Sequence, residues 1–217
     1  MQIIGIGLEI LVATVLGVVF FRLAHIALTE SETDAASSPP PAALYVVMTV
    51  SLLAVAAFLA GFYQAGPLPV AQILLILSVL WACAWADAKA FLIPNRVLLA
   101  GSMGALALLA VRILSQPGQV IYTIASTLVS TGALLLSALA CRLLSRGSVG
   151  MGDVKLLGVM GLCLADLVWG ALFCSFVAAF VYCVFLLVAK KAKRSDSIPF
   201  APLLLVGTVL AAFLTGV

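Results

Sequence analysis

The chain consists of long apolar stretches separated by short polar segments. A helix that crosses the hydrocarbon core of a bilayer needs about 20 mostly apolar residues. The stretches show no strict alternation of apolar and polar positions, which argues against the strands of a membrane β-barrel. The sequence therefore predicts an all-α bundle of about eight transmembrane helices, with six to eight possible, in one domain over residues 1–217. The predicted spans are 3–28, 42–62, 68–87, 97–114, 120–142, 154–168, 170–189 and 198–216.

The sixth and seventh predicted spans share one continuous apolar stretch at 154–189. At about 1.5 Å of rise per residue, this stretch is barely long enough for two crossings. We predict a break near Ala165, Asp166 and Leu167, where the only acidic residue of the stretch occurs. Without that break the chain has seven spans, and the C-terminus changes side.

The composition supports the membrane assignment. Of 217 residues, 65% are hydrophobic and 9% are charged, whereas a soluble domain carries about 25% charged residues. Too few polar side chains are present to cover a soluble surface. This excludes a soluble globular enzyme, a nucleic-acid binder with a broad basic face and a disordered chain. We therefore expect lipid as the surroundings of the chain and no nucleic acid as a partner.

The basic residues predict the orientation. With eight spans, ten of the eleven Lys and Arg residues fall on one side of the membrane, and only Arg112 falls on the other. Such an excess marks the cytoplasmic side, so both termini are expected outside. The segment 29–41 (TESETDAASSPPP) is then a short cytoplasmic linker between the first and second spans, which we interpret as a solvated loop. The ten residues are Arg22, Lys89, Arg96, Arg142, Arg146, Lys155, Lys190, Lys191, Lys193 and Arg194.

The sequence contains no motif that predicts a metal or cofactor site. The five cysteines form no Cys-x-x-Cys pair, and His25 is the single histidine. We therefore expect no metal, no disulfide framework and no cofactor, with the thiols serving as packing residues.

Ser and Thr residues recur at three- and four-residue spacing in 120–142. They favour close helix packing in lipid over the alternative of a polar pathway.

Two aspartates at one predicted membrane edge are the candidates for chemistry. Asp87 closes the third span and Asp153 opens the sixth, 66 residues later. Each has an ordinary explanation, since Asp153 can cap its helix and Asp87 beside Lys89 can be an interfacial charge. Carboxylates at a membrane edge are nevertheless costly and often functional.

The neighbouring residues favour a paired-aspartate site. Gly150 and Gly152 precede Asp153 and permit close approach of another chain. Pro94 and Asn95 follow Asp87 in a segment where proline forces an extended turn. Two carboxyls held around one water provide acid–base catalysis, because one takes a proton from the water while the other polarises a carbonyl.

At these residues the chain resembles the type IV prepilin leader peptidases, the bacterial branch of the GxGD intramembrane aspartic peptidases. Residues 150–156 (GMGDVKL) are similar to the family's Gly-x-Gly-Asp-x-Lys block, and 87–96 (DAKAFLIPNR) to its first Asp block. Residues 198–202 (IPFAP) resemble a later Pro-Phe-Gly-Pro segment, with Ala in place of Gly. The resemblance implies that Asp87 and Asp153 are catalytic. It also assigns site-shaping positions to Gly150, Gly152, Lys155, Pro94, Asn95, Pro199 and Phe200. Lys155 either tunes the charge of the pair or extends to the membrane interface.

The resemblance also implies a substrate and a location. The expected substrates are prepilins and pseudopilins with short, positively charged leaders, cut at the cytoplasmic face of the bacterial inner membrane. The expected partners include pilus assembly or secretion machinery. Larger members carry a Cys-x-x-Cys domain after the first span, where this chain has only 29–41. This chain is thus similar to the compact Tad/Flp-pilus type, without support for N-methyltransferase activity.

Other classes remain as alternatives. A small proton- or cation-coupled transporter would use Asp87 and Asp153 as relay carboxylates, although such residues usually lie near the middle of the membrane. A catalytically silent assembly scaffold is a third hypothesis. The archaeal preflagellin peptidases carry similar motifs and stay open as an alternative within the same peptidase class.

Overall fold

The computed structural model describes residues 2–30, 40–62, 66–145, 150–189 and 198–215. Over these residues the chain forms eight α-helices, two single 3-10 turns and no strand. Each predicted stretch corresponds to one helix, so the all-α fold class is confirmed. The helices are α1 (Gln2–Glu30), α2 (Ala42–Phe62), α3 (Pro67–Ala90), α4 (Asn95–Ser115), α5 (Val120–Leu144), α6 (Met151–Leu164), α7 (Val168–Val188) and α8 (Ala201–Thr215).

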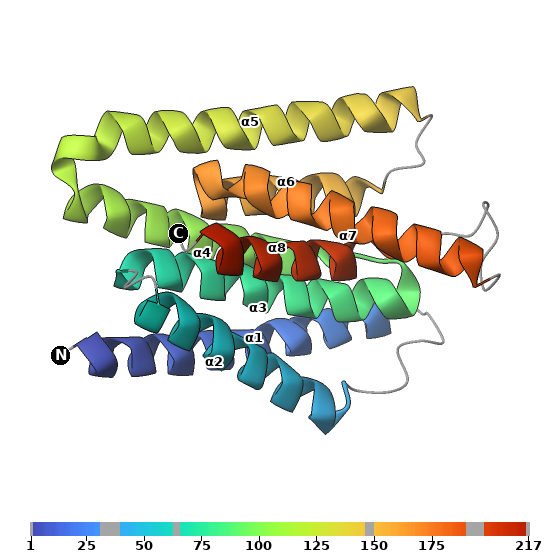
Figure 1. Ribbon diagram of the computed structural model, residues 1–217, viewed down its shortest axis with the longest axis horizontal. Helices are drawn as coiled ribbons and strands as arrows, with labels where there is room; N and C mark the ends of the chain where they lie inside the picture. The colour runs from blue at the N-terminus through green and yellow to red at the C-terminus, as the bar shows by residue number, and fades with distance from the viewer. Residues whose placement is uncertain (1, 31–39, 63–65, 146–149, 190–197, 216–217) are drawn as a thin grey trace.

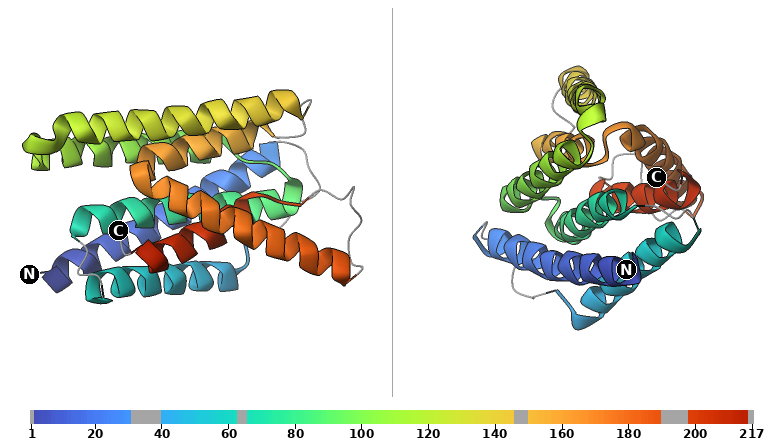
Figure 2. Two further views of the ribbon diagram at one scale, coloured as in Figure 1. Left: turned by 45° about the horizontal axis from the view of Figure 1, so that its top comes forward. Right: turned by 90° about the vertical axis from the view of Figure 1, so that its left-hand side faces the viewer.

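Successive helices alternate in direction and form one elongated bundle (Figure 1). The ends of α1 and α8 that carry the chain termini lie toward the same end of this bundle, and the two views in Figure 2 agree with this arrangement. The C-terminal ends of α3 and α5 therefore meet the N-terminal ends of α4, α6 and α8 at the other end. We call this the site end, because both candidate aspartates lie there.

Helix α3 is the centre of the bundle and packs against α1, α2, α4, α6 and α8. It is apolar on every side, as expected for a helix surrounded by others. Ile73, Leu74, Ile76, Leu77 and Leu80 are all buried in the core. Because α3 is fixed on all sides, a side chain in its last turn is held rigidly at the site end.

The predicted break between the sixth and seventh spans is present. Helix α6 ends at Leu164, the 3-10 turn η3 (Ala165–Leu167) follows, and α7 returns along the bundle (Figure 1). Ala165 takes a positive φ of 46°, a conformation that residues with a Cβ rarely adopt. The turn therefore reverses the chain at a position where the sequence offers no glycine.

The number of helices supported as spans is five to seven, fewer than the eight predicted. Five stretches are long and apolar enough to cross a membrane, with 151–188 taken as a single stretch. Two further apolar helices are shorter, over Thr14–Thr29 and Ala201–Thr215. The difference arises because 151–188 counts as one stretch although it contains both α6 and α7, and because Thr14–Thr29 and Ala201–Thr215 are shorter than a full span.

Small residues bring two pairs of helices into close contact. A Cβ on Gly161 of α6 would lie 2.8 Å from the Cα of Thr131 on α5. A Cβ on Gly207 of α8 would overlap the backbone and hydroxyl of Ser175 on α7. Four hydroxyl residues of α5 are buried in the bundle, as expected for residues that allow close helix packing in lipid. They are Thr123, Thr127, Ser130 and Thr131.

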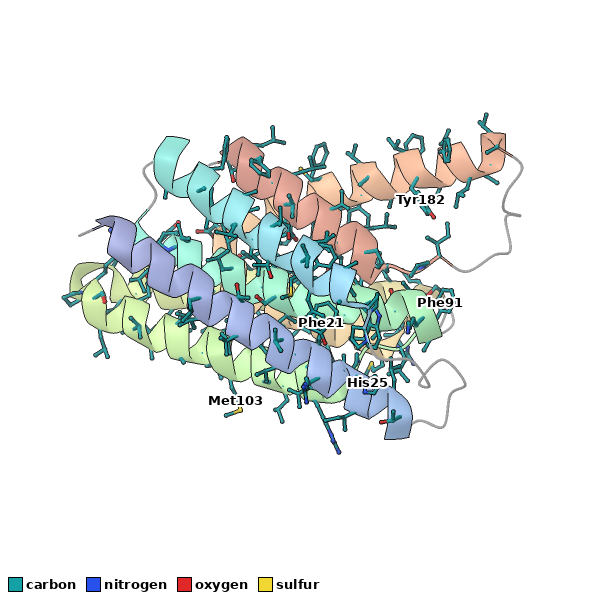
Figure 3. All side chains as sticks on the ribbon, turned by 90° about the horizontal axis from the view of Figure 1, so that it is seen from below. Phe21, His25, Phe91, Met103 and Tyr182 are labelled. Carbon is teal, nitrogen blue, oxygen red and sulfur yellow. The ribbon has the colours of Figure 1, made fainter. Side chains whose placement is uncertain are left out.

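Large apolar side chains cover the outside of the bundle. Phe173, Phe176 and Phe180 on α7 are all more than half exposed, and Tyr182 also points outward (Figure 3). In water such a surface would be an extensive hydrophobic patch, whereas lipid tails solvate it. The chain is therefore a helical membrane protein.

Some predictions concern residues outside those described. They are the central part of the linker (31–39) and the basic residues Arg146, Lys190, Lys191, Lys193 and Arg194. Among the described residues, Lys89, Arg96, Arg142 and Lys155 lie in terminal turns at the site end, and Arg112 lies in the last turn of α4 at the opposite end. Arg22 lies in α1 about two turns before the C-terminal end of that helix, so the predicted grouping is present for the five described residues of the ten.

Candidate active site

Asp87 lies in the last turn of α3 and is buried, with 6% of its surface exposed. Its Oδ2 accepts a hydrogen bond of 2.9 Å from the backbone N–H of Ala201, the first residue of α8. The interpretation of Asp87 as an ordinary interfacial charge is therefore wrong. Lys89 instead places its Nζ 4.8 Å from the centre of the Trp85 ring. The buried carboxylate satisfies one of the free N–H groups at the start of α8, which locks the two helices together.

Asp153 lies in the first turn of α6 and is half-buried. The helix begins at Met151, three residues earlier than predicted, because Gly150 takes the N-cap position. Asp153 is therefore the third residue of the helix, and the suggestion that it is the N-cap is wrong. Its carboxyl interacts with the backbone of Gly150, as an acidic residue at this position does in a capping box.

The two aspartates come together in one cavity. Asp87 and Asp153 both line a cavity of about 500 Å³ at the site end, and their carboxyls interact electrostatically. A water molecule takes up about 30 Å³, so the cavity has room for a water and a segment of peptide backbone. Two carboxyls that interact in this way do not ionise independently, which suits them to share one proton.

The segment between α3 and α4 forms one wall of this cavity. Phe91 ends α3 with a left-handed conformation (φ 50°, ψ 36°), and Pro94 begins α4 as its N-cap. The extended turn predicted from the proline is thus present. A Cβ on Gly152 would lie only 2.9 Å from the Cβ of Ile93. Glycine at 152 is therefore required for α6 to approach this segment.

Lys155 and Asn95 form a link across the cavity entrance. The Nζ of Lys155 donates a 2.9 Å hydrogen bond to the Oδ1 of Asn95, which joins α6 to the start of α4. Both residues are exposed and both line the cavity. The structure thus places Gly150, Gly152, Lys155, Pro94 and Asn95 in the lining of the cavity that contains the two aspartates; their site-shaping role stays a prediction.

Pro199 and Phe200 do not line this cavity. Phe200 is the residue before α8, and its carbonyl accepts the backbone N–H groups of Leu203 and Leu204. Its ring packs against the core. The segment instead reaches the site through its backbone, because both Phe200 and Ala201 interact with the Asp87 carboxyl by their backbone groups.

Sequence reasoning missed three residues at the site. The Ala201 N–H contacts Asp87, and no side-chain motif signals a backbone donor. Phe91 lines the cavity with 60% of its surface exposed, and Ala27 of α1 completes the lining. Neither has a sequence signal, because the left-handed end of α3 and the approach of α1 arise only in the folded chain.

The described residues contain no group of three or more His, Cys, Asp or Glu side chains that could hold a metal ion. All five cysteines are free; Cys83 and Cys163 are buried, and Cys141 is exposed. The polar side chains that line the cavity carry two carboxyls, the amine of Lys155, the guanidinium of Arg96 and the amide of Asn95.

Fold and site together define a helical membrane protein with a pair of carboxyls in a cavity at one end of its bundle. A model of the type IV leader peptidase family matches residues 74–188, just over half of the chain. The chain belongs to this family, which confirms the resemblance found in its motifs and makes the protein a peptidase. The matched range includes both aspartates and ends before the 198–202 segment. No curated protein and no solved structure gives a significant match.

Proposed function

We propose that this protein is an aspartic endopeptidase that removes the short, positively charged leaders of type IV, Flp-like prepilins and pseudopilins. The observation that carries the proposal is the cavity shared by Asp87 and Asp153. These side chains come from helices far apart in the sequence, and their carboxyls interact at one end of the bundle. Two interacting carboxyls around one cavity are what hydrolysis with a shared proton needs.

The proposed reaction uses one ionised and one protonated carboxyl. The ionised group takes a proton from water, and the resulting hydroxide attacks the carbonyl carbon of the scissile peptide bond. The protonated group passes its proton to the carbonyl oxygen, which gives a neutral tetrahedral intermediate. When the C–N bond breaks, the first carboxyl gives the proton that it took from water to the leaving nitrogen, and one hydroxyl of the intermediate returns a proton to the second carboxyl. The new carboxyl group leaves with the leader. The pair then returns to its shared-proton state.

The cytoplasmic face of the bacterial inner membrane is the proposed place of cleavage. The basic residues Lys89, Arg96, Arg142 and Lys155 surround the site end, and such an excess is typical of the cytoplasmic side. The short segment 29–41 supports the compact Tad/Flp type, with prepilins and pilus assembly machinery as partners. In contrast to relay carboxylates of transporters, which usually lie at mid-membrane, both aspartates lie at the end of the bundle. This favours the peptidase over the transporter.

Co-expression with a Flp-type prepilin tests the proposal. We expect the wild-type chain to shorten the prepilin by its leader, and both Asp87→Asn and Asp153→Asn to leave it uncut. Gly132→Ala is a matched control, because a Cβ at that position meets no atom within 4 Å. The pH–rate profile of wild type should be bell-shaped, since the pair must hold one proton. Processing by both Asn variants at the wild-type rate would overturn the proposal.

A further inference from the structure

A second hollow adjoins the catalytic cavity on the outside of the bundle. This α4–α6 groove has a volume of about 420 Å³. Asn95, Arg96 and Lys155 line both the groove and the cavity, so the two lie next to each other, and the Lys155–Asn95 hydrogen bond lies at their boundary. From there the groove continues along Leu98, Leu99, Ser102 and Val159.

The groove changes character along its length. Its mouth, at the cavity, carries the two cationic side chains of Arg96 and Lys155. Beyond the mouth, Leu98 and Val159 form a buried apolar floor, and Leu99 forms a rim that is 64% exposed. From Asn95 to Ser102 the groove follows about two turns of α4. An apolar helix can pack on this floor, and lipid otherwise fills it.

We propose that the α4–α6 groove receives the apolar helix of the substrate, next to the bond that is cut. This inference rests on the proposed function, since it concerns the substrate of the same site. The groove begins where the cavity ends, so a helix lying in it presents its first residues to Asp87 and Asp153. Both α4 and α6 start at this end, and the substrate helix therefore runs parallel to them.

The charges around the groove and the cavity select which part of the substrate lies in the groove. Arg96 and Lys155 line both spaces, but only the cavity also holds the two aspartates, whereas no acidic residue among those described lines the groove. A positively charged leader is therefore repelled from the groove and is attracted by the aspartates in the cavity. The apolar segment that follows the leader carries no such charge and gains from packing on Leu98 and Val159. The leader thus extends from the cavity into water, and the scissile bond lies between the two regions.

A comparison with the other large groove supports the choice. An apolar groove of about 580 Å³ lies between α7 and α8, lined by Phe173, Val177 and Leu210 among others. It shares no residue with the catalytic cavity. A helix held there has no contact with the residues that surround the aspartates. Lipid is therefore its expected occupant.

Photocrosslinking tests the position of the substrate helix. Benzoylphenylalanine replaces Ser102 in the groove or Phe180 on α7, each in an Asp153→Asn chain that retains uncut prepilin in membranes. We expect an adduct with the apolar segment of the prepilin from position 102 and none from position 180. An adduct of position 102 with the leader, or with lipid alone, overturns the inference. So does an adduct with the prepilin formed only from position 180.

Filling the groove provides a kinetic test. Ser102→Phe should raise KM for the full-length prepilin by at least about tenfold, with kcat changed by less than about twofold. The matched control is Met103→Phe, because Met103 is 64% exposed and points away from the bundle (Figure 3). An unchanged KM in Ser102→Phe contradicts the inference. If the wild-type chain cuts no prepilin at all, the proposed function fails; if it cuts but ignores the filled groove, only this inference fails.

Discussion

Substitution of Gly152 tests how α6 and the α3–α4 segment bring Asp87 and Asp153 into one cavity. A Cβ on Gly152 would lie 2.9 Å from the Cβ of Ile93 and 3.4 Å from its Cγ1. Ordinary contacts of this kind start near 3.4 Å, so Gly152→Ala must push the two segments apart by about 0.5 Å or more. Ile93 cannot easily yield, because it is β-branched and is held in an extended conformation by Pro94.

The displacement should affect both folding and catalysis, by free energies of similar size. Overpacking by one methyl group costs about 1–3 kcal/mol of unfolding free energy. Asp153 follows Gly152 directly, so the shift moves one carboxyl away from the other. Misplacement of a catalytic group by about 1 Å reduces the rate by up to about 100-fold. We therefore expect Gly152→Ala to lower kcat/KM by about 10- to 100-fold in a chain that still folds.

Two further variants isolate the cause. In Gly104→Ala the new Cβ would lie 3.1 Å from the flexible end of Leu75, away from the cavity, and prepilin cleavage should change by less than about threefold. Adding Ile93→Gly to Gly152→Ala removes the opposing Cβ and should restore most of the lost rate. Cleavage in detergent micelles and thermal unfolding of the same samples measure both effects. Wild-type cleavage by Gly152→Ala, or strictly additive losses in the double variant, would refute the reasoning.

Three more predictions follow from the packing around the site. Asp87→Ala should lower the free energy of unfolding by about 1–3 kcal/mol more than Asp87→Asn does, because only Asn keeps an acceptor for the Ala201 N–H. Equal unfolding temperatures of the two variants contradict this prediction. Gly207→Ala should separate α8 from α7 and cost about 3 kcal/mol or more, whereas Gly132→Ala, with open space around it, should stabilise its helix by up to about 1 kcal/mol. Thermal unfolding in detergent distinguishes these two. Phe91→Gly should relieve the strain of the left-handed φ of 50° and raise the free energy of unfolding by about 1 kcal/mol. KM for prepilin should rise, because an exposed aromatic side chain is lost from the wall of the cavity. A lower free energy of unfolding argues against strain at Phe91.

The local chemistry of the site could be predicted because it resides in short motifs. Gly-x-Gly before Asp153 and Ile-Pro-Asn after Asp87 each fix a local backbone shape. The structure places Gly150, Gly152, Pro94 and Asn95 around one cavity, in agreement with that expectation. By contrast, the N-cap role given to Asp153 failed because the glycines allow α6 to begin three residues earlier, at Met151.

The hydropathy pattern alone was enough to predict the helices of this protein. A chain with 9% charged residues can satisfy its backbone in lipid only through helices, and the apolar stretches, prolines and single acidic break mark where those helices begin and end. Neighbouring residues along the chain set these properties, so no contact between helices is needed to predict them. Even the reversal near Ala165 could be recognised from one polar position in an apolar run.

Only the tertiary structure decided which surfaces meet. Ala201 reaches Asp87 across 114 positions of sequence, and Lys155 reaches Asn95 across 60. Contacts over such distances depend on the side on which each helix packs, which small residues such as Gly161 and Gly207 select through close backbone approach. In lipid, apolar periodicity cannot report that choice, because both the buried and the lipid-facing sides of a helix are apolar. For this reason the sequence predicts the candidate catalytic residues, and the folded bundle alone reveals the cavity and the groove beside them.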